Sequence, residues 1–414
     1  MTDTIETPEQ FRARARAFVQ ANLERYDPDN PRQLDEEQAK QLQSRIFDAG
    51  FAGIAVPTDY GGAGLTLEHQ KVWAEEVDGY VVPAALCVSI GMLGITLLDH
   101  GSETLKARHI PRILRGDEVW IQLLSEPSGG SDMAAVMTRA TRDGDIWIIN
   151  GAKIWSTGAG SADYGMCLAR TNWDAPKHKG LSMFAVPLKD PSVTIEPIVG
   201  SEGGPAHFFQ EYFDDVALPV DHLIGQENEG WSVAHGLLFH ERNATAGVGH
   251  GLGLGGGHGD GLSDSDGVED LVRYATAAGS VAEPATRQLI AEAYVAEQAR
   301  EHANDRVGTG MRTGQFKGDW GSLLKLGLAL DTLRRREIAL TVAGADGVIW
   351  ADDAPDGGTA GTRWLSARSI SIAGGTNEMQ RNIVSERLLG MPREPATDRD
   401  VPFRDVVARR PRAD

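Results

Sequence analysis

An acidic residue occupies an unexpected position in a helical pattern near the middle of the chain. Apolar residues recur at helical spacing through Leu237 and Leu238, and continuing that spacing reaches Glu241. A carboxylate on or beside an inward-facing stripe loses hydration, so it usually has a partner or a task. Periodicity alone favours a structural ion pair or a partly exposed edge residue, and a catalytic base is the alternative.

A second chemical signal is a run of small residues that follows a short apolar stretch ending at Leu124. It reads SEPSGGSD (125–132) and offers hydroxyls and accessible backbone N–H groups. Small residues let a backbone approach a large flat or anionic ligand closely. About two dozen residues later, NGAKIWSTGA (150–159) places Trp155 and Thr157 on one face of a predicted strand. Either segment alone favours an ordinary turn beside a core Trp.

Together, the two segments resemble the flavin-binding middle domain of acyl-CoA dehydrogenases. The resemblance implies FAD as cofactor and dehydrogenation of an acyl-CoA to the trans-2-enoyl-CoA, with electrons passed to an electron-transfer flavoprotein. The positions that match flavin-contacting positions of the family are Leu124, Ser125, Gly130, Ser131, Trp155, Ser156, Thr157, Thr376 and Glu378.

The resemblance also indicates where the catalytic base lies. Most members carry it just before a Gly-Thr pair near the C-terminus, and the matching position in IAGGTNEMQR (372–381) is Gly374. Long-chain and isovaleryl-CoA dehydrogenases instead carry the acid in a Glu-Arg pair on an earlier helix, which Glu241-Arg242 matches. The resemblance therefore implies Glu241 as the base and Arg242 near the substrate. It leaves Gly374 to donate its backbone N–H to the thioester oxygen, beside a flavin ribityl hydroxyl.

The chain divides into three parts by its patterns. Residues 1–118 are helical in pattern, beginning with a helix start at Thr7-Pro8, and 226–394 are helical again, with helices expected at 268–278, 284–305, 319–344 and 376–388. Between them, 119–225 carries short runs rich in apolar, aromatic and β-branched residues. This order predicts an α+β protein with an N-terminal all-α domain, a middle β-barrel or sandwich domain and a C-terminal helical bundle, as in the acyl-CoA dehydrogenase fold. Residues 395–414, rich in Pro, Arg and Asp, are expected to be a poorly ordered tail.

A Gly-rich segment at 247–267 contains the spacing G-x-G-x-x-G. A dinucleotide-binding fingerprint needs a strand before it and a helix opening at it, and here a predicted helix precedes it. A flexible connection between two helices is the better interpretation. A flexible connection is also a better interpretation than a calcium loop at 264–267 or a metal site at His250 and His258.

Net charge and composition argue against several classes of partner. The formal net charge of −19 argues against nucleic acid and anionic membrane surfaces. Residues 80–98 carry no charge and approach spanning length, but their Pro, Gly, Ser and Thr content favours a buried helix at a subunit or domain contact. Cys87 and Cys167 form no metal or disulfide pattern, and the polar, acidic N-terminus shows no signal peptide, so a cytoplasmic location is expected.

The contacts that complete a flavin site between subunits are unclear in this sequence. Homotetrameric members of the family reach a neighbour's FAD with an R-x-x-F-G segment and a later Gln before a Gly-Gly turn. The nearest matches, RYATAAG (273–279) and TVAGADG (341–347), depart in spacing and residue type. In this the chain resembles bacterial acyl-CoA dehydrogenases of sterol side-chain breakdown, which pair two different chains. A divergent homotetramer and an α2β2 heterotetramer with a sister chain both remain open.

Three other functions also remain open. The chain could be a non-catalytic or half-site partner subunit, although Glu241 argues against this. It could be an oxygen-using relative, either an acyl-CoA oxidase or a flavin monooxygenase. It could act on acyl groups bound to a carrier protein, which its acidic charge disfavours weakly. The sequence does not fix the length, branching or ring content of the acyl group.

Overall fold

A computed structural model gives the fold and describes residues 6–27, 34–201, 203, 206–245, 267–316, 319–349 and 358–409. The N-terminal part contains α1 (Pro8–Asn22), α2 (Glu36–Asp48), α3 (Leu67–Glu76), α4 (Ile95–His100) and α5 (Glu103–Arg115). Local hydrogen bonds set where α1 and α2 begin. Thr7 and Asp35 each accept a hydrogen bond from the backbone three residues on, in a capping box, and Pro8 fills the first position of α1.

The uncharged stretch at 80–98 is buried, but it is not one continuous helix. It contains short helical turns at Ala84–Leu86 and Ser89–Gly94, the second of π type, before α4 begins. The Ser89 hydroxyl accepts a hydrogen bond of 2.9 Å from the backbone N–H of Trp120, the first residue of the sheet. The stretch therefore packs where the N-terminal helices meet the middle domain. In the described part of the chain, no helix is long and apolar enough to cross a membrane.

The middle part is a β domain, as predicted, and it is built from a mixed sheet. Its strands among the described residues are β1 (Trp120–Leu123), β2 (Arg139–Asp143), β3 (Ile146–Thr157), β4 (Tyr164–Arg170), β5 (Leu181–Pro187), β6 (Val193–Ile198), β7 (Phe208–Pro219) and β8 (Leu223–Ile224). Their order is β6-β7-β3-β2-β4-β5-β8, with β1 parallel to β4. The long pair β3 and β7 shifts register between Ile154 and Ser156, and this bulge contains Trp155.

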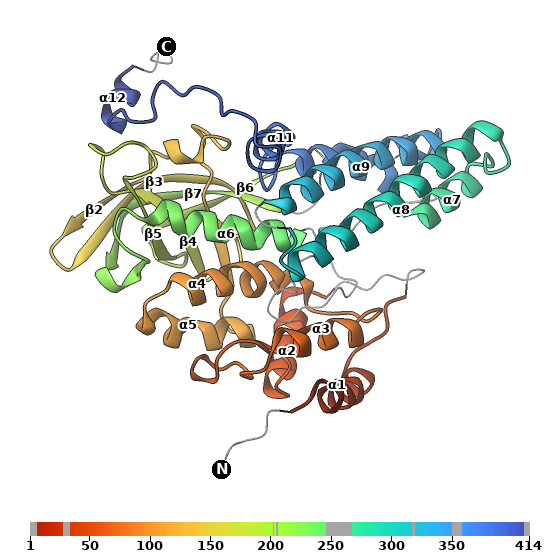
Figure 1. Cartoon of the computed structure of the whole chain (residues 1–414), viewed down its shortest axis with the longest axis horizontal. Helices are drawn as coiled ribbons and strands as arrows, with labels where there is room; N and C mark the ends of the chain where they lie inside the picture. The colour runs from red at the N-terminus through yellow and green to blue at the C-terminus, as the bar shows by residue number, and fades with distance from the viewer. Residues whose placement is uncertain are drawn as a thin grey trace.

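The C-terminal part returns to helix, which confirms the predicted order of helical, β and helical regions. Its helices are α6 (Gly230–Thr245), α7 (Val268–Ala277), α8 (Pro284–Arg312), α9 (Trp320–Ala343), α10 (Thr359–Ser366), the short helix η7 (Ala367–Ser371) and α11 (Asn377–Ile383). Helix α6 lies against the sheet, and α7, α8 and α9 form an arm that extends away from it (Figure 1). Of the Gly-rich segment, 247–266 lies outside the described residues.

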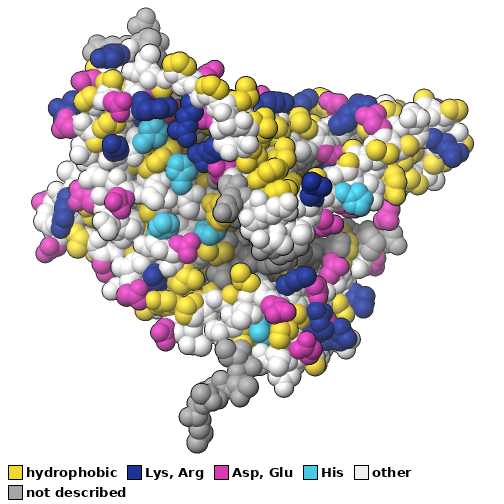
Figure 2. All heavy atoms as spheres, viewed as in Figure 1, with side chains coloured by type: hydrophobic (Ala, Val, Ile, Leu, Met, Phe, Trp, Pro, Cys, Tyr) yellow, Lys and Arg dark blue, Asp and Glu magenta, His cyan; other side chains and the backbone are white. Residues whose placement is uncertain are grey.

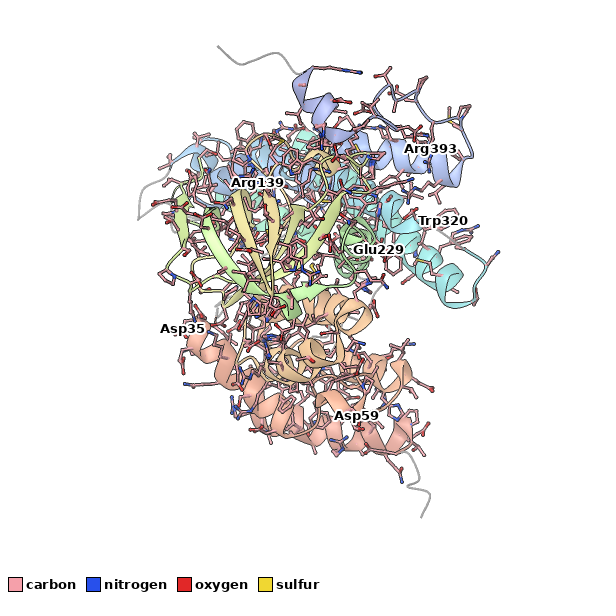
Figure 3. The ribbon with its side chains drawn as sticks, turned by 90° about the vertical axis from the view of Figure 1, so that its left-hand side faces the viewer. Asp35, Asp59, Arg139, Glu229, Trp320 and Arg393 are labelled. Atoms are coloured by element: carbon pink, nitrogen blue, oxygen red, sulfur yellow. The ribbon has the colours of Figure 1, made fainter. Side chains whose placement is uncertain are left out.

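Close backbone packing fixes the start of α6. Gly230 lies so near β5 that a Cβ there would be 2.5 Å from Ser182 Cα. Only glycine permits this approach. From there, the buried residues Val233, Ala234 and Leu237 hold one face of α6 in the core. Figure 3 shows the three parts stacked, with Asp35 and Asp59 near one end, Arg139 in the sheet and Arg393 near the other end.

The prediction of a poorly ordered tail is wrong for 395–409. The Phe403 ring, at the start of α12 (Phe403–Ala408), is fully buried, and the Arg170 guanidinium carbon lies 3.6 Å from its centroid. The Phe403 backbone N–H donates to Ala175 O at 3.0 Å, and Lys177 pairs with Asp398 at 2.9 Å. This cation–π contact with the middle domain offsets the low local preference for order.

We expect Phe403→Ala to release the tail. Truncating a buried Phe costs about 3–5 kcal/mol, and here it also removes the contact with Arg170. Limited proteolysis should then cleave the variant within 392–409 at least ten times faster than the wild type. The control variant Arg409→Ala, at an exposed position, should be cleaved at the wild-type rate. Equal cleavage of Phe403→Ala and the wild type would contradict the docking.

Candidate functional site

The two positions predicted to do the chemistry meet in space, although 133 residues of sequence separate them. A Cβ built on Gly374 would lie 3.2 Å from Glu241 Oε1. Glu241 itself is half-buried near the C-terminal end of α6, next to a buried stripe. Gly374 has φ +66°, in the left-handed region that favours glycine. The carboxylate of Glu241 therefore lies where a side chain at position 374 would begin.

The turn that carries Gly374, residues 370–375, is held by two buried side chains. Lys325 of α9 donates from Nζ to Ile370 O at 2.7 Å and to Gly375 O at 3.1 Å. Gln380 of α11 donates from Nε2 to Gly374 O at 2.8 Å and to Gly375 O at 3.2 Å. Within the described part of the chain, no hydrogen bond uses the Gly374 N–H. This donor is thus available at the same point as the Glu241 carboxylate.

The predicted flavin positions of the middle domain form a surface at the end of β1 and along β3. Ser125 O accepts a hydrogen bond of 3.0 Å from the Ile154 N–H, which joins the two segments. Trp155 has φ +66°, an unusual value for a residue other than glycine, and its side chain is 57% exposed. Thr157 is exposed as well, so an aromatic ring and a hydroxyl lie exposed two residues apart on β3.

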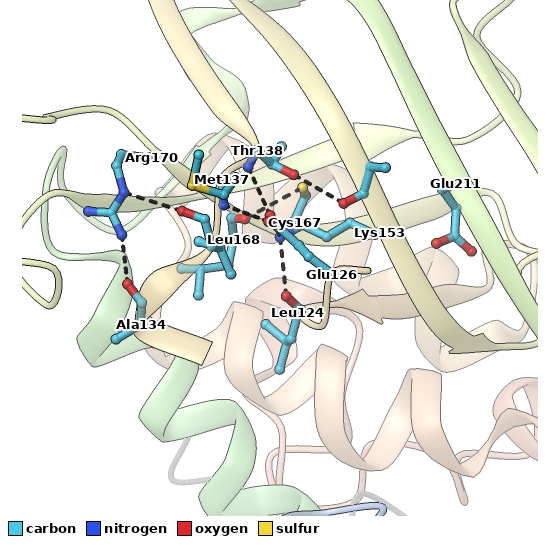
Figure 4. Close-up of polar contacts among 12 residues, drawn as sticks. Leu124, Glu126, Ala134, Met137, Thr138, Lys153, Cys167, Leu168, Arg170 and Glu211 are labelled. Atoms are coloured by element: carbon cyan, nitrogen blue, oxygen red, sulfur yellow. Dashed lines mark hydrogen bonds and ion pairs between the residues drawn. The ribbon is translucent and has the colours of Figure 1, made fainter. Parts of the chain in front are cut away.

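A buried ion pair joins the two segments that form this surface, and Figure 4 shows its hydrogen bonds. Lys153 Nζ donates to Glu126 Oε1 at 2.8 Å and to Leu124 O at 3.2 Å, and Glu126 accepts from the N–H groups of Met137 and Thr138. Burial alone would raise the pKa of Glu126, but Lys153 and these donors lower it on balance. The ion pair ties the 125–132 segment to β3.

Ser156, between Trp155 and Thr157, points the opposite way. Its hydroxyl is buried and donates to Glu211 Oε2 of β7 at 2.9 Å. Burial raises the pKa of Glu211 to about 7, although the bond from Ser156 opposes this shift. The Ser156 side chain therefore supports the surface from below.

The remaining predicted positions lie on two segments. Gly130 and Ser131 are exposed in the 125–132 segment, whereas Leu124 is buried at its start. Thr376 caps α11 by accepting from the Met379 N–H at 3.2 Å, and Glu378 is exposed beside Arg381. Arg242 continues α6 after Glu241, and its side chain lies outside the described residues.

Sequence reasoning missed the residues that hold these groups in place. Lys325 lies in the apolar run LLKLGLAL (323–330) and shares a helix face with the buried Ala329 and Thr332. A charge on an apolar face is the same signal that identified Glu241, and it was available here too. Arg170 ends β4 with no local signal of its own, yet it donates to Ala134 O at 2.6 Å and Val136 O at 3.3 Å.

Comparisons with known proteins match all three parts of the chain. The N-terminal, middle and C-terminal domains of acyl-CoA dehydrogenases match 5–117, 122–216 and 264–389. The chain is 32% identical over 403 residues to the acyl-CoA dehydrogenase IpdE1 of Mycobacterium tuberculosis, covering 94% of this chain and 99% of that protein.

Two solved structures share the fold. A steroid acyl-CoA dehydrogenase, Tcur3481-Tcur3483, matches with a TM-score of 0.74 and 28% identity over 94% of this chain and 98% of that one. The ChsE4-ChsE5 complex from Mycobacterium tuberculosis matches with a TM-score of 0.71 and 22% identity, over 95% and 100% of the two chains.

Glu211 predicts a pH dependence of stability. Its folded pKa of about 7 lies above the ordinary 4.5, so the folded protein binds the proton more tightly and stability falls as the pH rises from about 4.5 to 7. The loss is on the order of 3 kcal/mol. Glu211→Gln should therefore gain thermal stability relative to the wild type as the pH increases across this window. Glu196→Gln, at an exposed position of β6, serves as control. A difference between Glu211→Gln and wild type that stays constant with pH would contradict this.

Proposed function

We propose that this chain, which belongs to the acyl-CoA dehydrogenase family, converts an acyl-CoA to its trans-2-enoyl-CoA with Glu241 as the base. The observation that carries the assignment is the 3.2 Å separation between Glu241 Oε1 and the Cβ position of Gly374. In the resemblance drawn from sequence, the acid of this family stands at one of these two positions. Because both positions reach the same point, a carboxylate from either can serve the same carbon.

The surface along β3 fits a flavin. Trp155 offers a flat, exposed ring, Thr157 an exposed hydroxyl, and the 129–131 backbone a stretch of small residues for an anionic group. Leu124, Ser125, Gly130, Ser131, Trp155 and Thr157 would hold FAD there, with Ser156 supporting from beneath and Thr376 and Glu378 reaching it from α11. When bound, FAD accepts the hydride that leaves the β-carbon of the acyl group.

The chain's own residues account for the proton. Glu241 takes the α-proton onto a carboxylate oxygen, from a half-buried position beside Gly374. The Gly374 N–H donates to the thioester oxygen, where negative charge develops as the proton leaves. Loss of the α-proton and the β-hydride leaves the double bond. The electrons then pass to an electron-transfer flavoprotein.

We expect Glu241→Gln to slow flavin reduction by an acyl-CoA about 10³-fold, because the amide cannot accept the α-proton. The measurement is anaerobic bleaching of the flavin absorbance. Glu196→Gln should behave as the wild type. Near-normal reduction of the Glu241→Gln variant with its flavin still bound would rule out this base, and peroxide formed with turnover in air would make the protein an oxidase.

Moving the acid gives a sharper test of the shared point. Glu241→Gly should abolish flavin reduction by an acyl-CoA. Adding Gly374→Glu to this variant should raise the reduction rate at least about 10-fold, because both carboxylates reach one place. Recovery stays incomplete, since a left-handed non-glycine residue costs about 1–2 kcal/mol. A double variant no faster than Glu241→Gly alone would contradict the shared position.

We also propose that this chain works with a sister acyl-CoA dehydrogenase chain rather than as a homotetramer. Arg273, in the segment nearest to the usual cross-subunit motif, pairs with Asp270 of its own helix at 2.6 Å. Figure 2 shows hydrophobic side chains over the arm formed by α7, α8 and α9. Its exposed apolar residues are Val272, Tyr294, Val295, Leu323 and Leu330. The two-chain Tcur3481-Tcur3483 and ChsE4-ChsE5 assemblies support this choice, and the first supports a steroid-derived acyl group.

Co-expression with the acyl-CoA dehydrogenase chain encoded nearest to it should therefore yield a complex that retains FAD. The chain expressed alone should lose most of its flavin on gel filtration, because the cofactor contacts from the second subunit are missing. The measurements are flavin content per chain and mass by light scattering. A homotetramer that holds one FAD per chain and bleaches fully with acyl-CoA would contradict the heteromeric assembly.

A further inference from the structure

A buried lysine lies behind the site and takes no part in the proton and hydride transfers proposed above. Lys325 of α9 is 2% exposed and lies on the helix face that also buries Ala329 and Thr332. Removing an ammonium group from water is costly unless its protons are bonded and its charge is balanced. Two questions follow for Lys325: which acceptors bind its protons, and which group balances its charge.

The protons of Lys325 go to the turn that carries Gly374. Nζ donates to Ile370 O and Gly375 O, at the two ends of the 370–375 turn, and Cε lies 3.8 Å from the Cβ position of Gly374. Gly374 and Gly375 have φ +66° and +92°, so two adjacent residues lack the restriction that a side chain gives. The orientation of the Gly374 N–H consequently depends on side chains that bind the turn from outside.

The charge of Lys325 acts on Glu241. Burial lowers the pKa of Lys325, and the Glu241 carboxylate acts in the opposite direction. Other titratable groups around α6 face different partners. His240 Nε2 lies 2.9 Å from Asp99 Oδ2 of α4, and His100 of α4 lies against Gly236, one and a half turns before Glu241. On α11, Glu378 and Arg381 pair with each other at the surface.

We propose that Lys325 is a positioning residue for dehydrogenation. Its ammonium group holds the 370–375 turn so that the Gly374 N–H and the Glu241 carboxylate face one point, and it places a positive charge beside that carboxylate. This rests on the proposed function of Glu241 and Gly374. Lys325 acts through these two groups and does not touch the reacting atoms.

The chain offers a matched control for the two parts of this role. Gln380 is buried and binds the same turn through Gly374 O and Gly375 O, but it carries no charge. Lys325→Met removes a turn anchor and the charge, Lys325→Gln removes the charge but keeps a donor, Lys325→Arg keeps the charge, and Gln380→Leu removes only an anchor. Comparison of the four variants separates anchoring from electrostatics.

The first readout is hydrogen exchange of the purified protein without substrate, followed by mass spectrometry. Peptides covering 370–376 should exchange at least about 10-fold faster in Lys325→Met and Gln380→Leu than in the wild type, and peptides from β6 should be unchanged. Wild-type exchange at 370–376 in Lys325→Met would overturn the anchoring role. This readout does not depend on catalysis.

The second readout is the pH profile of flavin reduction by an acyl-CoA. Removing a nearby positive charge generally favours the protonated form of a carboxylic acid, so the rise of the profile should move up by about one pH unit in Lys325→Met and Lys325→Gln. Lys325→Arg and Gln380→Leu should keep the wild-type midpoint, although Gln380→Leu should reduce more slowly. An unmoved midpoint in both neutral variants, or an equal shift in Gln380→Leu, would overturn the electrostatic role.

The two levels of the proposal fail in different ways. If no acyl-CoA reduces the wild-type flavin, the proposed function is wrong, whatever the lysine does. If the wild type is reduced and the Lys325 variants match it in exchange and in pH midpoint, the function stands and the role of Lys325 is wrong. Should Lys325→Met fail to fold, Lys325→Gln gives the same comparison with a donor in place.

Discussion

The arrangement of this site depends on the absence of a side chain at one position. Gly374 leaves the space that the Glu241 carboxylate approaches, since a Cβ there would lie 3.2 Å from Oε1. The same glycine takes a left-handed backbone conformation and leaves its N–H without a partner in the described part of the chain. One glycine thus makes room for an acid from another helix and supplies a donor beside it. The proposed base and the proposed oxyanion donor can converge because only one of the two positions has a side chain.

Buried polar side chains hold each half of the site. Beneath the β3 surface, Lys153 and Glu126 form a fully buried pair that fastens the 125–132 segment to the sheet. Behind the acid, Lys325 and Gln380 fasten the 370–375 turn. In both places a charged group replaces its lost hydration with backbone carbonyl or N–H partners, which is what makes such burial tolerable. The cost of burial favours fixed geometry over fluctuation at the points where ligand contacts are expected.

Local signals in the sequence predicted most of the architecture. The cap at Thr7 and the helical patterns of α6 and α9 depend on neighbours in sequence, so these helices were predicted, and α9 is observed within one residue of its expected bounds. The expected helix at 376–388 instead changes to π geometry after Ile383. The docked tail was missed because Phe403 is ordered by Arg170, more than two hundred residues away. Tertiary contacts of this kind leave no periodic trace.

The site itself was only partly accessible to sequence reasoning. Glu241 stood out because an acid on an apolar helix face is costly, but nothing local linked it to Gly374, and the resemblance to a family supplied that link. The anchors Lys325 and Gln380 act through backbone carbonyls, which carry no residue-specific signal. Chemical groups can therefore be inferred from residue type, whereas the side chains that orient them emerge only from the fold.

The central claim is that Glu241 and Gly374 act on the same substrate. The most direct measurement is a structure of the protein, with its partner chain if one is required, bound to FAD and an unreactive acyl-CoA analogue. The account predicts a Glu241 carboxylate oxygen within about 3.5 Å of the α-carbon and the Gly374 nitrogen within about 3.2 Å of the thioester oxygen. An acyl chain that lies elsewhere, or a thioester oxygen bound by other donors while Glu241 points away, would contradict it.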